Sequence, residues 1–126
     1  MHLLLDTHIF LWCVNGDRRL SESDKALILE ADEVYVSSAS IWEASIKIKL
    51  KKLDANVKQL VKAISASGFI ELPITAEHAA AVSLLPDLHK DPFDRILIAQ
   101  AVCEPLMFVT ADRTLEGYSD LIKIVK

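Results

Sequence analysis

The stretch that decides the fold reads His89-Lys-Asp-Pro-Phe-Asp-Arg-Ile-Leu-Ile-Ala-Gln-Ala101. Pro92 lacks a backbone N–H and has a fixed φ, which suits the first position of a helix, and Asp91 before it can cap that helix. From Ile96 onward the residues are apolar or favour helices, until Glu104-Pro105 ends the run. A helix is therefore predicted from the first proline up to the second.

Asp94 is the unusual member of this helix. Its neighbours at i+3, i+4 and i+7 are Leu97, Ile98 and Ala101, so Asp94 is predicted on the face that turns toward the core. No basic residue stands at i+4 to pair with it. A carboxylate above an apolar stripe costs free energy unless a cation meets it, so the sequence predicts a cation near this side chain.

Strands and helices alternate along the whole chain. Apolar runs predict strands at residues 2–5, 34–36, 69–73, 106–109 and 122–125. Helical patterns lie between them, at about residues 9–14, 25–31, 40–50, 56–67, 75–85 and 92–104, with a short helical turn before Gly117. This alternation predicts an α/β fold with a mostly parallel central sheet of four to five strands and helices on both faces. We expect one domain over residues 1–126, with the two helices after the second strand projecting as a clip.

The composition narrows the class of protein. The chain has 126 residues, of which 52% are hydrophobic, and this is enough for an ordered core. The net charge of −4 argues against a protein that binds nucleic acid by bulk electrostatic attraction. We predict that Cys13 and Cys103 are buried thiols in a reducing compartment. We predict that Trp12 and Trp42 are core residues, and the alternative for them is stacking or a partner contact. The N-terminus does not resemble a signal peptide and no run is long enough to span a membrane, so we expect a cytoplasmic protein.

Four acidic residues are predicted to meet at one edge of the sheet. Asp6 directly follows the first strand and Asp112 follows the fourth. Glu43 lies one turn into the helix after the second strand, and Asp94 opens the helix that leads into the fourth. Ligands of parallel sheets bind at the carboxyl ends of the strands. Each residue also has a structural alternative: Asp6 and Asp112 can cap the turns that follow them, Asp94 can favour its helix dipole, and Glu43 can pair with Lys47.

Taken together, the four carboxylates indicate a metal site. Carboxylates that crowd into one site repel one another, and they stay ionised only when a cation neutralises them. Oxygen ligands without a cysteine or histidine cluster favour Mg²⁺, with Mn²⁺ as a substitute. Such an ion also binds phosphate oxygens and activates water for attack on phosphorus, so hydrolysis of a phosphodiester bond is the predicted chemistry.

Other side chains are candidates for a place near this site. His8 and His89 flank the predicted acids, and Arg95 can reach a substrate phosphate, a partner or a neighbouring carboxylate. Asp91 is most simply the cap of its helix. The sequence also has a dense basic run, Lys47, Lys49, Lys51 and Lys52. This run is either a solvated face or a contact with an RNA backbone.

The chain resembles a PIN domain, and most of all the VapC-type toxins of bacterial type II toxin–antitoxin systems. The resemblance covers essentially the whole chain. It rests on Leu4-Leu5-Asp6-Thr7-His8, Ser40-Ile-Trp-Glu-Ala-Ser-Ile-Lys47 with Lys52-Leu53, the stretch 89–101 quoted above, and Val109-Thr110-Ala111-Asp112.

The resemblance implies a PIN fold and a Mg²⁺-dependent endoribonuclease that cleaves single-stranded RNA. The positions that match the family's catalytic acids are Asp6, Glu43, Asp94 and Asp112, and the expected metal ligands are Asp6, Asp94 and Asp112. Asp91 matches an additional acid in the same loop, and Thr110 matches a hydroxyl beside the site. The resemblance also implies a homodimer and a cognate antitoxin that covers the acidic site.

Two alternatives stay open at the level of sequence. One is another Mg²⁺-dependent phosphoryl-transfer enzyme, although Asp6-Thr7-His8 lacks the second aspartate of a dehalogenase-type phosphatase. The other is an inactive PIN-like module that acts through protein contacts alone. An activity that is lost in EDTA and restored by Mg²⁺ or Mn²⁺ excludes the second alternative.

Overall fold

The computed structural model describes residues 1–88 and 90–125, and its core is a five-stranded parallel sheet. Its strands run in the order β3-β2-β1-β4-β5, and every neighbouring pair is parallel. Their bounds are β1 His2–Leu5, β2 Glu33–Ser37, β3 Ile70–Leu72, β4 Met107–Thr110 and β5 Ile122–Ile124. The predicted α/β class and parallel sheet are confirmed.

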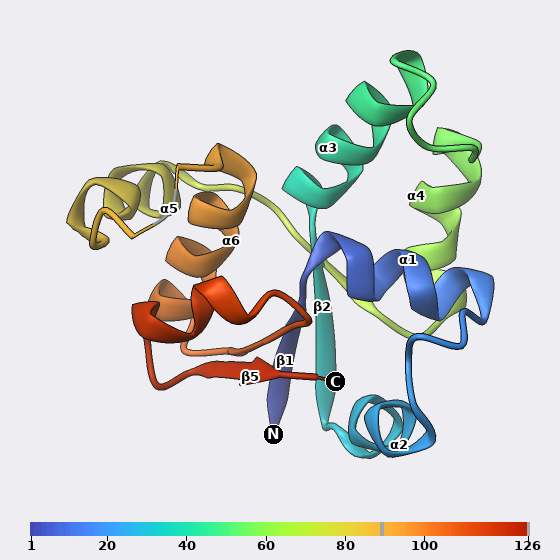
Figure 1. The fold of residues 1–126 in the computed structure, drawn as a ribbon, viewed down its shortest axis with the longest axis horizontal. Helices are drawn as coiled ribbons and strands as arrows, with labels where there is room; N and C mark the ends of the chain where they lie inside the picture. Colours follow the sequence, from blue (N-terminus) through green and yellow to red (C-terminus); the bar gives the residue numbers. More distant parts are fainter. Residues whose placement is uncertain (89, 126) are drawn as a thin grey trace.

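Helices connect these strands on both faces of the sheet. They are α1 Thr7–Asn15, α2 Glu22–Glu30, α3 Ser38–Lys49, α4 Val57–Ala66, α5 Ala76–Ala81 and α6 Pro92–Cys103, with short 3₁₀ helices η1 Val82–Leu84 and η2 Arg113–Tyr118. Figure 1 shows α5 and α6 on one side of the central strands and α1, α2 and α4 on the other. The single helix predicted at 75–85 is divided into α5 and η1. The tighter 3₁₀ turn ends just before Pro86, and proline disfavours helical backbone in the residue that precedes it.

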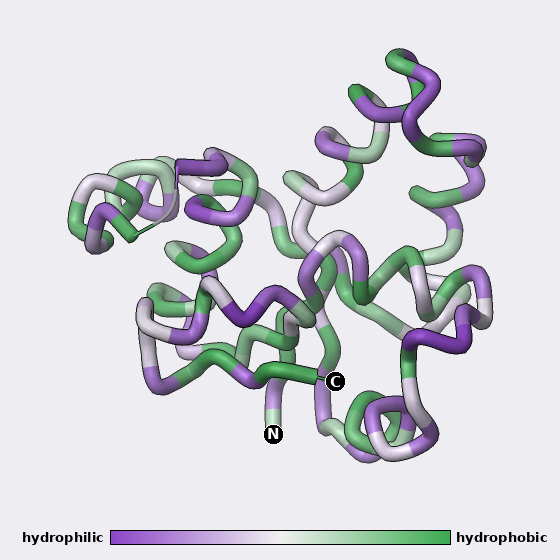
Figure 2. Tube along the Cα trace, viewed as in Figure 1, coloured by the Kyte–Doolittle hydropathy of each residue, from purple (hydrophilic) through white to green (hydrophobic). Residues whose placement is uncertain are grey.

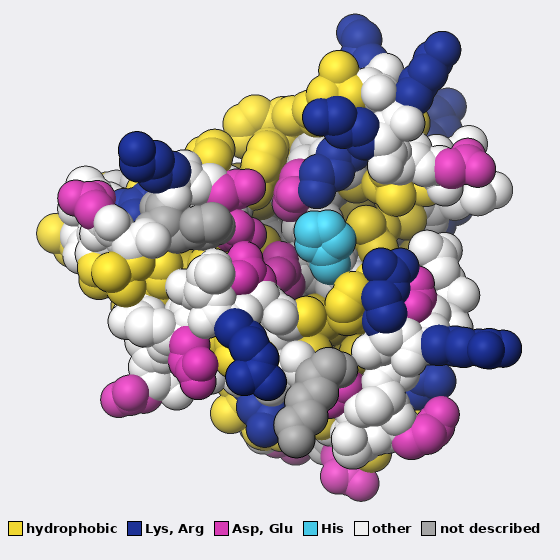
Figure 3. Space-filling model, viewed as in Figure 1, with side chains coloured by type: hydrophobic (Ala, Val, Ile, Leu, Met, Phe, Trp, Pro, Cys, Tyr) yellow, Lys and Arg dark blue, Asp and Glu magenta, His cyan; other side chains and the backbone are white. Residues whose placement is uncertain are grey.

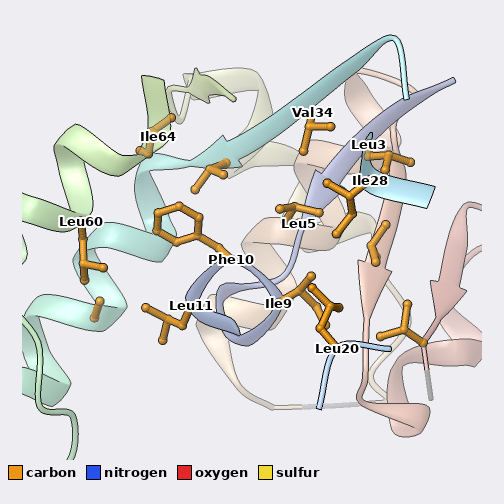
Figure 4. Packing of buried hydrophobic residues seen from close by; sticks show 14 residues of the cluster. Leu3, Leu5, Ile9, Phe10, Leu11, Leu20, Ile28, Val34, Leu60 and Ile64 are labelled. Carbon is orange, nitrogen blue, oxygen red and sulfur yellow. The ribbon is translucent and has the colours of Figure 1, made fainter. Parts of the chain in front are cut away.

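Strand β1 contributes side chains to two separate cores. Leu3 and Leu5 pack with α1, α2 and α4, whereas Leu4 points to the other face and packs with α6. All three are fully buried. Figure 4 shows the first core, in which Phe10 of α1 and Ile64 of α4 lie over the sheet. The alternation of faces follows from the two-residue period of a strand, and burial on both sides explains why β1 is apolar throughout.

Caps set the ends of the helices that matter most for the site. The Asp6 side chain accepts a hydrogen bond from the backbone N–H of Thr7 at the start of α1. Gly16 ends the same helix with φ 61°, a left-handed conformation that glycine adopts without strain. Asp91 caps α6 through the N–H groups of Phe93 and Asp94, with Pro92 at the first helical position as predicted.

Helices α3 and α4 extend beyond the sheet as the predicted clip (Figure 1). They pack against each other, and their connection carries Lys51 and Lys52. Figure 2 shows hydrophilic segments at the outer end of this pair, where the chain turns back toward the sheet. The outer end of the clip is therefore a polar projection, and its inner end is anchored on the core.

Three burial predictions were wrong. Cys103 is exposed, and Cys13 is half-buried and free rather than fully enclosed. Trp42 is 59% exposed on α3, although a tryptophan in a helix was predicted to be in the core. In each case the local pattern correctly predicts a helix, but the neighbouring elements leave that side of it uncovered. No described helix combines the length and the apolar character that crossing a membrane requires.

Candidate active site

A hollow of about 440 Å³ lies at the carboxyl edge of the parallel sheet. We call it the acidic hollow, because five carboxylates line it. Its lining consists of Asp6, Glu43, Asp91, Asp94 and Asp112 together with His8, Trp12, Lys47 and Ala111. Figure 3 shows acidic side chains gathered at the centre of this face, beside a histidine. All four acids predicted to converge therefore line one hollow, although they come from distant parts of the chain.

Asp6 is the most enclosed acid of the hollow, with 5% of its surface exposed. Its Oδ1 accepts the Thr7 N–H at 2.7 Å, and its Oδ2 accepts the Thr110 hydroxyl at 2.6 Å. Burial raises the pKa of Asp6, and the charge of Glu43 acts in the same direction. The Thr110 hydroxyl, the nearby His8 and the Thr7 N–H lower this pKa but do not cancel the effect of burial. A cation in the hollow would favour the charged carboxylate.

Thr110 links two of the acids at the end of β4. Its hydroxyl donates to Asp6 and accepts the backbone N–H of Asp112 at 3.1 Å. Asp112 in turn accepts the N–H and the hydroxyl of Thr114, at 3.0 and 2.6 Å. The structural alternative for Asp112 is thus present, because it caps the turn that opens η2. Both of these bonds go to Oδ1 of Asp112.

Glu43 enters the hollow from α3 as a nearly buried carboxylate, 8% exposed. Lys47, one helical turn later, places its Nζ 2.9 Å from Glu43 Oε2. The i,i+4 pair expected from the sequence is therefore formed. Because both side chains line the hollow, the pair forms part of the hollow's wall and supplies it with a positive charge.

Asp91 and Asp94 come from the first turn of α6. Asp91 is exposed and uses its Oδ1 to accept two backbone N–H groups, at 2.8 Å from Phe93 and 3.2 Å from Asp94. Asp94 is half-buried, and like Asp91 it lines the acidic hollow. The helix runs back along the sheet from this edge, so its apolar face packs on β4 while its first turn presents carboxylates to the hollow.

Arg95, Lys49, Lys51 and Lys52 do not line the acidic hollow. Arg95 donates to the carbonyl oxygens of Val82 and Pro86, at 3.1 and 2.9 Å, so its guanidinium holds the segment before α6. Lys52 lines a neighbouring hollow, whereas Lys49 and Lys51 are exposed on the clip. The residue missed by the sequence analysis is Trp12, which lines the acidic hollow. Its i+4 spacing from His8 on α1 is the signal that could have found it. His89 lies outside the described residues.

The donor set of the hollow fits a hard divalent cation. Every carboxylate supplies oxygen, and burial raises the pKa of Asp6, so that its charged form is favoured only when a cation is close. In the described part of the chain, no three histidine, cysteine or acidic side chains are already arranged to hold a metal ion. The five carboxylates therefore share a hollow without forming a ready-made metal cluster.

Comparison with known proteins decides the family. A family model for the PIN domain matches residues 3–121. The chain belongs to the PIN-domain family. This PIN domain is also similar to ribonuclease VapC22 of Mycobacterium tuberculosis, with 29% identity over 122 residues that cover 92% of this chain and 91% of the relative.

Solved structures share the fold of this PIN domain. One is VapBC2 from Rickettsia felis bound to a DNA fragment from their promoter. Its TM-score is 0.74 at 15% sequence identity, and the match covers 99% of this chain and 98% of the Rickettsia chain. A toxin–antitoxin complex from Klebsiella pneumoniae gives 0.68 at 18% identity, with coverages of 96% and 95%. FitAcB from Neisseria gonorrhoeae gives 0.61 at 20% identity, with coverages of 89% and 88%. At these identities the likeness concerns the fold.

Proposed function

We propose that the protein is a metal-dependent endoribonuclease and the toxin of a toxin–antitoxin pair. The observation that carries the proposal is the acidic hollow, where carboxylates from four separate segments line one space at the carboxyl edge of the sheet. Support also comes from membership of the PIN-domain family and from the similarity to a relative named as a ribonuclease. One of the similar structures, from Klebsiella pneumoniae, is a toxin–antitoxin complex, which supports a protein partner for this chain.

In the proposed site, Asp6, Asp94 and Asp112 hold Mg²⁺, for which Mn²⁺ can substitute. When bound, the ion supplies Lewis-acid chemistry at an RNA phosphate and lowers the pKa of water. Thr110 keeps Asp6 oriented through its hydroxyl, and the cap of α6 fixes the position of Asp94. Glu43 orients the attacking water and accepts its proton at a carboxylate oxygen. Attack of this water on phosphorus breaks the P–O3′ bond, and the leaving 3′ oxygen takes a proton from solvent, which gives 5′-phosphate and 3′-hydroxyl ends.

The test is cleavage of RNA by the purified chain with Mg²⁺, with EDTA, and with EDTA followed by excess Mg²⁺. We expect Asp94→Asn to lower the cleavage rate by at least about a hundredfold, because it removes a charge that stabilises the bound ion. Its circular dichroism spectrum and melting temperature should stay close to those of the native chain. Asp54→Asn makes the same chemical change at an exposed position of the clip connection and should cleave normally.

Three outcomes would contradict the proposal in whole or in part. Cleavage by Asp94→Asn at the native rate would remove this residue from the site. Cleavage that persists in EDTA would exclude metal-dependent hydrolysis. If the native chain cuts no RNA under any of these conditions but binds a partner protein, the inactive module is the better description.

The proposed assembly is a homodimer that binds a cognate antitoxin over the acidic hollow. Light scattering on the purified chain measures the first part of this proposal. Co-expression with the neighbouring gene, followed by a cleavage assay of the purified complex, measures the second.

A further inference from the structure

Three hollows adjoin one another on this face, because neighbouring hollows share lining residues, and we call this row of hollows the groove. The acidic hollow shares Glu43, Lys47 and Asp91 with a second hollow of about 290 Å³ along α3. The second shares Pro92 and Phe93 with a third, of about 520 Å³, between α3 and the α5–α6 segment. The groove therefore leads from the predicted metal ligands past the first turn of α6 to the exposed side of α3.

An aromatic pair lies at the far end of this groove. Trp42 and Phe93 both line the third hollow, with ring centroids 5.0 Å apart and planes at 75°. Phe93 stands next to Asp94 in sequence, and Trp42 next to Glu43, so each ring is fixed on a helix that also carries a predicted catalytic acid. Trp42 is nevertheless 59% exposed, which leaves much of its ring surface open to a ligand.

The charge along the groove changes between its two ends. Carboxylates dominate the acidic hollow. In the second hollow Lys47 and Lys52 stand beside Glu43 and Asp91, and the third hollow is lined by Lys90 and Arg95. Figure 3 shows hydrophobic surface next to the acidic centre, with basic side chains on either side of it. An aromatic surface flanked by lysines fits a single strand of nucleic acid, because phosphates meet the cations while a base meets the ring.

We propose that Trp42 and Phe93 form a stacking subsite for one base of a single-stranded RNA. The RNA backbone runs from the acidic hollow along Lys47 and Lys52, so this inference rests on the proposed function. The base must be free of a complementary strand, because a paired and stacked base cannot present its face to Trp42. A second copy of the chain is the competing occupant, because apolar side chains line much of the third hollow. The lysines favour RNA, since a second copy would bury them without supplying phosphates.

The test measures RNA binding separately from cleavage, in an Asp94→Asn background with Mg²⁺ present. The probe is a short fluorescein-labelled oligoadenylate, and its control is the same RNA with the bases removed. We expect Trp42→Leu to weaken binding of the oligoadenylate about tenfold, within the range for loss of one stacked base. The matched Trp42→Phe keeps an aromatic face and should retain most of the affinity. Neither substitution should change binding of the abasic RNA.

A lysine variant distinguishes the backbone contact from the stacking contact. Lys52→Met should weaken binding of both RNAs to a similar extent and reduce the salt dependence of binding by about one ion. Trp42→Leu should leave that salt dependence unchanged, because stacking does not release counterions from phosphates.

Failure of this inference and failure of the proposed function give different results. If Trp42→Leu binds both RNAs as tightly as its parent while the native chain cleaves RNA, the stacking subsite is rejected and the nuclease stands. If binding depends on Trp42 but the native chain never cleaves, the nuclease is rejected and the subsite stands. A lower molecular mass of Trp42→Leu in light scattering would show that a second copy covers this surface, and would overturn the inference.

Discussion

At the scale of single residues, Asp6 combines structural and chemical demands in one side chain. It caps α1, accepts the Thr110 hydroxyl and lies almost buried at the end of β1. Burial raises its pKa, so the folded chain holds a proton on Asp6 at a higher pH than the unfolded chain does. The ionised carboxylate therefore lowers the stability of the fold as pH rises through the folded pKa, and a cation in the hollow would compensate for this loss.

This argument predicts how Mg²⁺ and pH act together on stability. At neutral pH, Mg²⁺ should raise the melting temperature, by an amount equivalent to about 2.7 kcal/mol when its concentration is a hundred times its dissociation constant. As pH falls through the folded pKa of Asp6, protons compete for the carboxylate and the stabilisation should fade. Thermal melts at several pH values, with and without Mg²⁺, measure this effect.

NaCl at the same ionic strength is the control for general screening of charge. Asp6→Asn should lose most of the Mg²⁺-dependent gain at every pH. A gain that stays constant over the whole pH range would show that the ion binds elsewhere.

At the scale of the element, α6 brings several functions together in its cap and first two turns. Asp91 caps the helix, Phe93 faces the groove, Asp94 lines the acidic hollow, and Leu97 and Ile98 hold the helix on the sheet. The cap fixes where the helix starts, and the helical period then determines which side chain points to the hollow. Replacing the cap should therefore affect both stability and the position of Asp94.

Two substitutions separate the structural role of Asp91 from a direct role in the site. Asp91→Ala removes the acceptor for two N–H groups and should lower the free energy of unfolding by about 1 kcal/mol. Asp91→Ser retains a capping oxygen and should recover most of that stability, together with RNA cleavage close to the native rate. Urea denaturation and a cleavage assay on the same preparations provide both measurements. A stable but inactive Asp91→Ser would instead assign its carboxylate to the metal site.

The sequence predicted most elements because their causes are local. A proline, a capping side chain and an apolar run determine α6 without reference to the rest of the chain, and the apolar strand followed by Asp6 marks the end of β1 in the same way. The convergence of the acids was also predictable, because parallel strands end at one edge of the sheet. The roles of these acids in catalysis stay predictions.

Exposure was not predictable from local pattern. Trp42 and Cys103 lie in helices whose apolar residues suggested burial, yet the elements that would cover them are absent from that side of the described fold. The groove was missed for the same reason, because its walls come from α3 and α6, which lie far apart in the sequence. Only the tertiary arrangement brings Phe93 to Trp42.

At the scale of the whole molecule, one strand joins two cores, and this should make unfolding cooperative. Leu4 belongs to the core under α6, whereas Leu5 belongs to the core under α1 and α4, and both are fully buried. Loss of either core would leave β1 with one uncovered apolar face, so neither core is expected to persist alone. Leu4→Ala and Leu5→Ala should each cost about 2–5 kcal/mol of unfolding free energy.

Urea denaturation followed by both tryptophan fluorescence and circular dichroism tests this expectation. Each variant should give a single transition that coincides for the two probes, at a lower urea concentration than the native chain. Leu84→Ala is the control, because Leu84 is 85% exposed and its loss should change stability by less than about 0.5 kcal/mol. Two separated transitions in Leu4→Ala would show that the core under α1 survives without the other. In that case Asp6 and Asp94 would separate in the first transition. Asp6 follows the shared strand β1, whereas Asp94 belongs to α6, which covers the core that unfolds first.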